Sequence, residues 1–114
     1  MNLQDNVTTF TISDFARTLT SNGNGTDHAW GGNVLAMGGS VNGGKIYGQY
    51  PTLALNSNLL VDESAIIPTT SCDEYFAELA LWLGASSNQL SSILPNIGNF
   101  YSPGSASLPI GFMR

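Results

Sequence analysis

The chain has 114 residues, of which 42% are hydrophobic and only 10% are charged, with 13 glycines and a net charge of −5. This length suits one domain with one core, and three basic residues against eight acidic ones exclude the basic surface that a nucleic acid requires. No stretch of about 18 apolar residues is present, which excludes a membrane-spanning helix, and a single cysteine excludes an internal disulfide.

Two segments of contrasting pattern open the chain. Residues 7–13, VTTFTIS, are rich in alternating β-branched and aromatic side chains, which predicts a strand. Residues 20–32, TSNGNGTDHAWGG, contain two Asn-Gly pairs and no apolar period, which indicates a loop. The only histidine, His28, is therefore expected in a loop.

The glycine-rich middle of the chain predicts a hairpin. Two apolar stretches, 33–41 and 45–50, flank an Asn-Gly-Gly turn and predict a β-hairpin around 33–50. The same region contains GSVNGGK, which matches a phosphate-binding loop up to its lysine. That loop requires Ser or Thr after Lys45 and then a helix, whereas Ile46 and a predicted strand follow, so a hairpin turn is the better interpretation.

One helix is well marked by its ends. Ser71 and Glu74 have the spacing of a capping box, and Gly84 stands where a left-handed C-terminal residue is favoured, which predicts a main helix at about 72–83. Cys72, at its start, is expected to face the core as an inert thiol rather than to act as a nucleophile with His28. The residues expected to pack from this helix are Tyr75, Phe76, Leu79, Trp82 and Leu83.

The remaining segments carry weaker signals. Residues 51–68 lie between two prolines without a clear period and are expected to run over the surface with a short extended piece. Ser86 and Gln89 repeat the capping-box spacing and predict a short helix at about 87–94. Residues 96–114 are interrupted by Pro and Gly and are expected to be extended.

Oxygen and imidazole donors concentrate near the first loop. Asp14, Asp27 and His28 are donor types that bind divalent metals. A catalytic zinc site uses three protein ligands and a two-metal site uses more, so these residues by themselves favour a polar loop and leave a metal site as the alternative.

The run TFTISDFARTLTSNGNGTDHAWGGNVLAMGGSVNGGKIYGQYP, residues 9–51, resembles a bacterial family catalogued as domain of unknown function 1501. Members of that family share a strand, a Ser-Glu-Phe-Gly-Arg-Thr motif or a close variant, an Asp-His-Gly-like loop and a Gly-Gly hairpin. The resemblance continues through residues 67–84, 94–100 and 108–113, and so covers almost the whole chain.

The resemblance implies the α/β fold of the alkaline phosphatase and sulfatase superfamily, which has three layers with a central sheet between helices. Members of the family are several times longer than this chain. Residues 1–114 are therefore expected to form a single incomplete domain, the C-terminal fragment of an alkaline phosphatase-like domain. The resemblance therefore implies that the missing N-terminal part of the same protein is a partner of this chain.

The resemblance also assigns roles to four residues. Asp14 corresponds to a metal-binding aspartate at a strand end, and Phe15 stands where sulfatases have a histidine. His28 corresponds to a later metal-binding histidine, and Asp27 is expected to bind the same metal or to orient the imidazole. Arg17 corresponds to the family arginine and is expected to bind an anion through its forked guanidinium.

Two functions follow from the resemblance. The first is a metal-dependent hydrolase of phosphate or sulfate esters that uses zinc, calcium or magnesium, in which the fragment is inactive alone. The second is an exported, non-catalytic binding or structural protein that keeps the superfamily scaffold. The parent is expected to be exported or periplasmic although this chain carries no signal, and exposed strand edges are expected to favour a homo-oligomer.

Overall fold

The computed structural model describes residues 2–62 and 64–114, and it shows a mixed α/β chain with small sheets and two α-helices. Within those two ranges the strands pair antiparallel into three separate two-stranded sheets: β1 with β4, β2 with β3, and β5 with β6. In chain order the elements are η1 (Gln4–Asn6), β1 (Thr8–Phe10), β2 (Ala16–Arg17), β3 (His28–Ala29), β4 (Ala36–Gly38), β5 (Leu60–Val61), β6 (Ala65–Ile66), α1 (Cys72–Trp82), η2 (Ser87–Gln89), α2 (Leu90–Ile93) and η3 (Ile97–Asn99).

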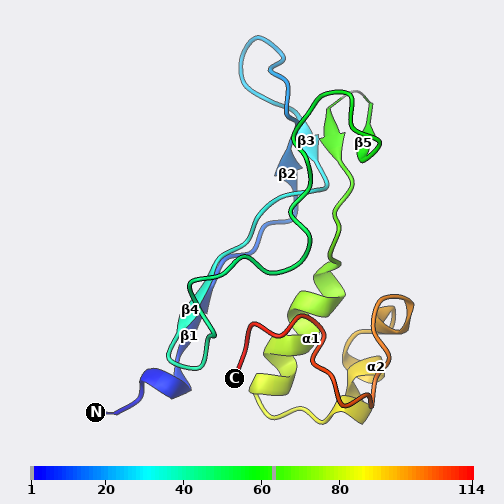
Figure 1. Cartoon of the computed structure of the whole chain (residues 1–114). Helices are drawn as coiled ribbons and strands as arrows, with labels where there is room; N and C mark the ends of the chain where they lie inside the picture. The colour runs from blue at the N-terminus through cyan, green and yellow to red at the C-terminus, as the bar shows by residue number, and fades with distance from the viewer. Residues whose placement is uncertain (1, 63) are drawn as a thin grey trace.

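The molecule is elongated, with principal extents of 48, 35 and 21 Å. Helices α1 and α2 lie at one end, and a long arm of paired strands leads away to the β2–β3 and β5–β6 sheets (Figure 1). The loop between β2 and β3 forms the far tip of this arm. Across the described ranges, no helix is both long and apolar enough to span a bilayer.

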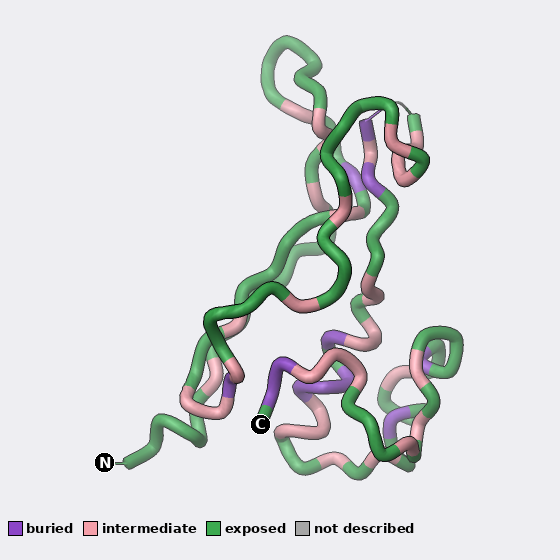
Figure 2. Tube along the Cα trace, in the orientation of Figure 1, coloured by how far each residue is buried: buried purple, intermediate pink, exposed green. Residues whose placement is uncertain are grey.

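Buried side chains gather at the helical end, in two clusters that both include residues of α1 (Figure 2). Most of the arm is exposed, apart from a small patch where Ala29, Ser64 and Ile66 are buried. The first cluster consists of Val41, Tyr75, Leu79, Phe112 and Met113, and the second of Ala77, Leu90 and Ile97. The hydrophobic stabilisation of this chain is therefore concentrated around α1.

Helix α1 begins where the sequence predicts. The Glu74 N–H donates to Ser71 Oγ at 3.1 Å, and the Ser71 N–H donates to the Glu74 carboxylate at 2.9 Å, which confirms the capping box. The last helical residue is Trp82, one before the predicted end, and Gly84 follows with φ +101°. A left-handed backbone conformation, which only glycine adopts easily, therefore ends the helix, as predicted.

The predicted packing face of α1 is only partly correct. Tyr75 and Leu79 are buried, whereas Phe76 is 36% exposed and Leu83 is 77% exposed. Cys72 is exposed as well, so the expectation that its thiol faces the core is wrong. The clusters around α1 are formed with the C-terminal segment, α2 and η3, and these elements cover one side of the helix.

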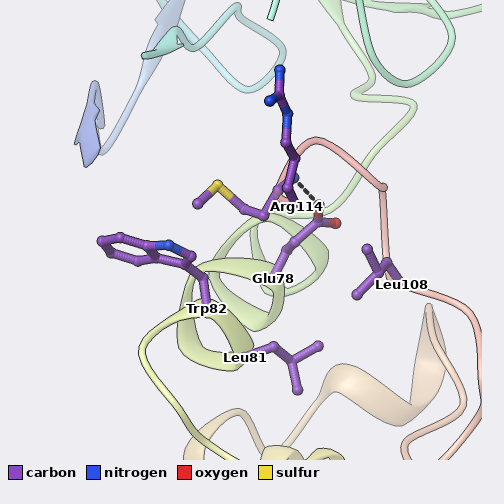
Figure 3. A pocket seen from close by; sticks show the side chains of 6 residues that line it. Glu78, Leu81, Trp82, Leu108 and Arg114 are labelled. Carbon is purple, nitrogen blue, oxygen red and sulfur yellow. Dashed lines mark hydrogen bonds between the residues drawn. The ribbon is translucent and has the colours of Figure 1, made fainter. Parts of the chain in front are cut away.

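Glu78 lies fully buried on α1 and joins the helix to the end of the chain. Its Oε2 accepts the backbone N–H groups of Ile110 and Gly111 at 2.7 and 2.6 Å, and its Oε1 accepts that of Met113 at 2.7 Å. One of these bonds is drawn in Figure 3, beside a cavity of about 130 Å³ that Trp82 also lines. Because a buried carboxylate needs partners that replace water, these bonds hold the C-terminal segment against α1.

The predicted β-hairpin around 33–50 is wrong. Its first half contributes β4, which pairs with β1, and residues 45–50 form no strand. Gly48 has φ +74°, which interrupts extended backbone. Tyr47 packs edge-on against Phe112 at 6.3 Å, and its hydroxyl donates to a carbonyl of the preceding turn at 2.6 Å. Packing of Tyr47 at the helical end therefore replaces strand pairing in this segment.

Other predicted elements are present in shorter form. The strand expected over 7–13 is the three-residue β1, and the short helix expected over 87–94 is η2 followed by α2. His28 lies in β3 rather than in a loop, because the backbone turns back at 18–27 and pairs with β2. The short extended piece expected within 51–68 is the β5–β6 pair.

Because of Tyr75, the stability of the folded chain depends on pH in the alkaline range. Its ring stacks on Phe112 at 5.4 Å and meets Phe10 edge-on at 6.2 Å, and burial raises its pKa above the ordinary value of 10.0. The folded state therefore keeps a proton that the unfolded state releases near pH 10. This contribution to stability is complete below that pH and is lost as the pH rises through the folded pKa.

We therefore expect the free energy of unfolding to decrease above about pH 10. Ultraviolet absorbance of tyrosinate should show a late titration step, above pH 10, that belongs to Tyr75. Tyr75→Phe keeps the ring and removes the ionisable group, so this variant should lose the late titration and show a flatter alkaline decline. The same late titration in Tyr75→Phe would contradict the assignment.

Candidate functional site

The β2–β3 pair positions two of the predicted site residues. Arg17 and His28 are directly opposite in the antiparallel register, so their side chains lie on the same face of the pair. The Thr18 N–H donates to the Asp27 carbonyl at 3.0 Å, which continues the pairing by one step beyond the strands. Both side chains are exposed at the arm, away from the helical end.

Phe15 joins these two side chains into one cluster. Its ring stacks on the His28 imidazole, with centroids 3.8 Å apart and planes 13° from parallel. The Arg17 guanidinium carbon lies 5.0 Å from the Phe15 ring centre, a cation–π distance, and Arg17 Nη1 donates to the Thr26 carbonyl at 2.7 Å. We call Phe15, Arg17 and His28 the β2–β3 cluster.

Asp27 does not contribute its carboxylate to this cluster through any contact that the structure shows. Its Oδ1 accepts the Asn22 side-chain amide at 2.8 Å, and its N–H donates to Thr18 Oγ1 at 3.1 Å. Because successive side chains of a strand point to opposite faces, Asp27 and His28 diverge. The Asp27 side chain thereby stabilises the loop at the tip of the arm.

The structure does not gather Asp14, Asp27 and His28 into a metal site. In the described part of the chain, residues 2–62 and 64–114, no group of three or more His, Cys, Asp or Glu side chains is arranged to hold a metal ion. The imidazole ring of His28 stacks on the Phe15 ring. The roles of these three residues as ligands stay predictions from the resemblance.

A broad groove of about 950 Å³ runs between the arm and the helical end. Asp14 and Arg17 line it, together with Lys45 from the glycine-rich turn. Trp30 and Tyr50 also line it and are 70% and 53% exposed. The groove thus combines two of the three basic residues of the chain with exposed aromatic faces.

Sequence reasoning missed Trp30 and Tyr50 as groove residues. Each stands next to Gly or Pro in an irregular segment, where no period shows which way a side chain points. Lys45 was noticed only as part of a phosphate-loop match, and no helix follows it in the structure, which agrees with rejecting that motif. The signal available in the sequence is a large aromatic residue in a polar, glycine-rich segment.

Comparison with protein families shows which family the chain belongs to. A family model described as "Protein of unknown function (DUF1501)" matches residues 2–67. The chain belongs to the DUF1501 family. No curated protein and no solved structure matches it.

The DUF1501 match contains all four residues that the sequence nominated for a site: Asp14, Arg17, Asp27 and His28. It ends one residue beyond β6, so the arm lies within the match and α1 lies outside it. The β2–β3 cluster therefore belongs to the part of the chain that defines its membership of DUF1501.

Proposed function

We propose that this DUF1501 chain is part of a hydrolase of phosphate or sulfate esters, in which Arg17 binds the anionic group. The observation that supports this proposal is the fixed position of the Arg17 guanidinium between the Thr26 carbonyl and the Phe15 ring, opposite His28. A guanidinium carries five N–H donors in a planar fork suited to oxyanions, and the bond to Thr26 occupies one of them. The remaining donors suit a tetrahedral anion.

The chemistry of ester cleavage explains why such an arginine is useful. Negative charge on the transferred group is spread over its outer oxygens, and a donor that is already in position stabilises that charge without reorganisation. His28 supplies a second donor on the same face as Arg17. The organic part of the ester would lie in the groove, against the exposed faces of Trp30 and Tyr50.

A divalent metal fits the described residues poorly. A catalytic site needs about three protein ligands, and no such group is arranged within the described residues. The positive charge of Arg17 next to His28 also disfavours a second cation at the imidazole. A zinc, calcium or magnesium ion at Asp14 and His28, with Asp27 as ligand or orienting partner, would need further ligands from elsewhere, and no step is derived through it.

The alkaline phosphatase-like fold is part of the same proposal. The described residues form only two-stranded antiparallel sheets, so the central sheet of a three-layer α/β domain would come from other strands of the parent. We propose an exported parent of this fold, in which residues 1–114 form an incomplete domain.

His28 offers a direct test of anion binding because it is the only histidine. Its ring protons should be followed by NMR at fixed pH while inorganic phosphate or sulfate is added at constant ionic strength. We expect a saturable shift with a dissociation constant on the order of 10 mM, as suits a few charge-assisted hydrogen bonds at an exposed site. Arg17→Gln should weaken this binding at least about tenfold.

Arg114→Gln is the matched control, because it removes the same charge and Arg114 lines the small cavity beside Glu78 instead. This variant should bind phosphate as the parent does. Equal binding in Arg17→Gln, or no saturable shift at all, would overturn the anion-binding role. A zinc titration completes the test: a saturable shift at micromolar zinc would assign His28 to a metal site and remove it as a second donor to the anion.

A non-catalytic, exported binding or structural protein is the second candidate. It is favoured by Phe15, which occupies one face of the His28 imidazole, and by the number of large apolar side chains exposed along the arm. Such a protein would use the arm for contacts rather than for chemistry. Absence of anion binding together with stable association of the chain would favour this candidate over the hydrolase.

A further inference from the structure

The chain exposes more surface than its mass requires. Its accessible surface is 7713 Å², whereas a compact monomer of 12.0 kDa exposes roughly 6,000 Å². Its radius of gyration is 16.1 Å, compared with about 13 Å for a compact domain of this length. The excess of about 1,700 Å² is twice the roughly 800 Å² that each partner buries in a standard protein interface.

The ribbon formed by β1 and β4 exposes several large apolar side chains. Val7 and Ile12 flank β1 and are 59% and 64% exposed. Leu35, which precedes β4, and Met37, in β4, are 66% and 61% exposed. An isolated two-stranded ribbon with both faces in water is marginally stable. The contact of Phe10 with Tyr75 anchors one face only in part, since Phe10 remains 41% exposed.

The hydrogen-bonding pattern identifies the free edge of the ribbon. The Thr11 N–H donates to the Leu35 carbonyl at 2.9 Å, so these two residues face each other across the ladder. Alternation along an antiparallel pair then turns the N–H and C=O of Thr8 and Phe10 outward, away from β4. On β4 the corresponding Gly38 carbonyl already accepts the Val41 N–H at 3.1 Å, so β1 presents the freer edge.

The sequence of this edge lacks the features that prevent strand addition. Residues 7–12, VTTFTI, contain no charge, no proline and no glycine, and β-branched and aromatic residues make up the segment. The opposite stretch, 28–44, is also free of charged residues. Although each chain carries a net charge of −5, the ribbon itself would not repel an identical ribbon.

We propose that two copies of this chain associate through β1, antiparallel and about a two-fold axis, into a continuous sheet ordered β4–β1–β1′–β4′. A second copy is the occupant because an antiparallel edge strand is complementary to itself, and a two-fold contact closes after one pairing. The new pairing satisfies the outward groups of Thr8 and Phe10. The net charge of each copy acts against association, so added salt should strengthen the dimer.

Analytical ultracentrifugation of the whole chain over a range of concentrations tests the association. We expect a monomer–dimer equilibrium, with tighter association as salt is raised from low to moderate concentration. Ile12→Lys places a charge beside the edge and should weaken the dimer at least about tenfold. Leu83→Lys is the matched control, since it adds the same charge at the end of α1, where Leu83 is 77% exposed, and it should leave the dimer unchanged.

Hydrogen exchange locates the interface independently of any variant. The amides of Thr8 and Phe10 should be protected at high protein concentration and should exchange faster on dilution. The Thr9 amide faces β4 and should change much less. A monomer at all concentrations, unhindered exchange of Thr8 and Phe10 in the dimer, or open-ended association would each overturn the proposal.

Discussion

Replacing Glu78 with glutamine is expected to lower the free energy of unfolding by about 3 kcal/mol. The wild-type carboxylate accepts three backbone N–H groups in a fully buried position. An amide keeps one acceptor oxygen and places an NH₂ group against at least one of these donors, which leaves buried donors without a partner. Urea unfolding followed by circular dichroism measures the change, and the melting temperature should fall by roughly 10–15 °C.

Asp5→Asn is the control for this substitution, because it removes the same charge from an exposed residue. It should change stability by less than about 0.5 kcal/mol. In Glu78→Gln, amide exchange at Ile110, Gly111 and Met113 should accelerate more than exchange in the rest of the core. An unchanged unfolding midpoint would show that the C-terminal segment is held by its apolar contacts alone.

Shortening Leu90 to alanine is expected to cost about 3 kcal/mol of stability. Leu90 is fully buried in the cluster that joins α1 to α2 and η3, so its removal leaves a cavity between these elements. Leu83→Ala provides the same chemical change at a residue that is 77% exposed, and it should cost less than about 0.5 kcal/mol. Both variants should be compared at one protein concentration, because association stabilises the folded chain.

Equal losses in Leu90→Ala and Leu83→Ala would contradict the packing described here. Such a result would mean that Leu83 is buried in solution, for example by contact with other protein. Concentration dependence of the Leu83→Ala unfolding midpoint would reveal that contact. The pair of variants therefore tests both the core and the exposure of the outer side of α1.

Helix ends were the most predictable part of this fold. Ser71 and Glu74 accept hydrogen bonds from each other's backbone N–H groups within one turn. Gly84 adopts a positive φ, which other residues adopt only with strain. These interactions depend on residues a few positions apart and therefore leave a signature in the sequence. The same reasoning predicted the second capping box at Ser86 and Gln89, which is present.

Strand pairing was predicted less well. The turn signal at Asn42 suggested that residues on either side of it pair, yet β4 pairs with β1, with Met37 opposite Thr9. Tyr47 and Gly48 determine this outcome, one by packing at the helical end and the other by its backbone conformation. Competition between a local turn and a distant partner is decided by packing energy, which a period along the chain does not record.

The candidate site was also predicted in part. Sequence resemblance selected Arg17 and His28, and the structure places them opposite each other in one strand pair. It did not predict that Phe15 would stack on the imidazole or that Asp27 would bind Asn22. Those contacts depend on the direction of each side chain from a two-residue strand, too short to show alternation in the sequence.

By itself, the sequence determined the capped helix, the glycine that ends it, the low charge of the surface and membership of the DUF1501 family. The first three rest on composition or on interactions between near neighbours, and the family membership rests on the match over residues 2–67. Only the tertiary structure decided that Glu78 holds the chain end, that β1 pairs with β4 and that the arm stays exposed. These features join residues distant in sequence, where burial and hydrogen-bond geometry choose between partners that are locally equivalent.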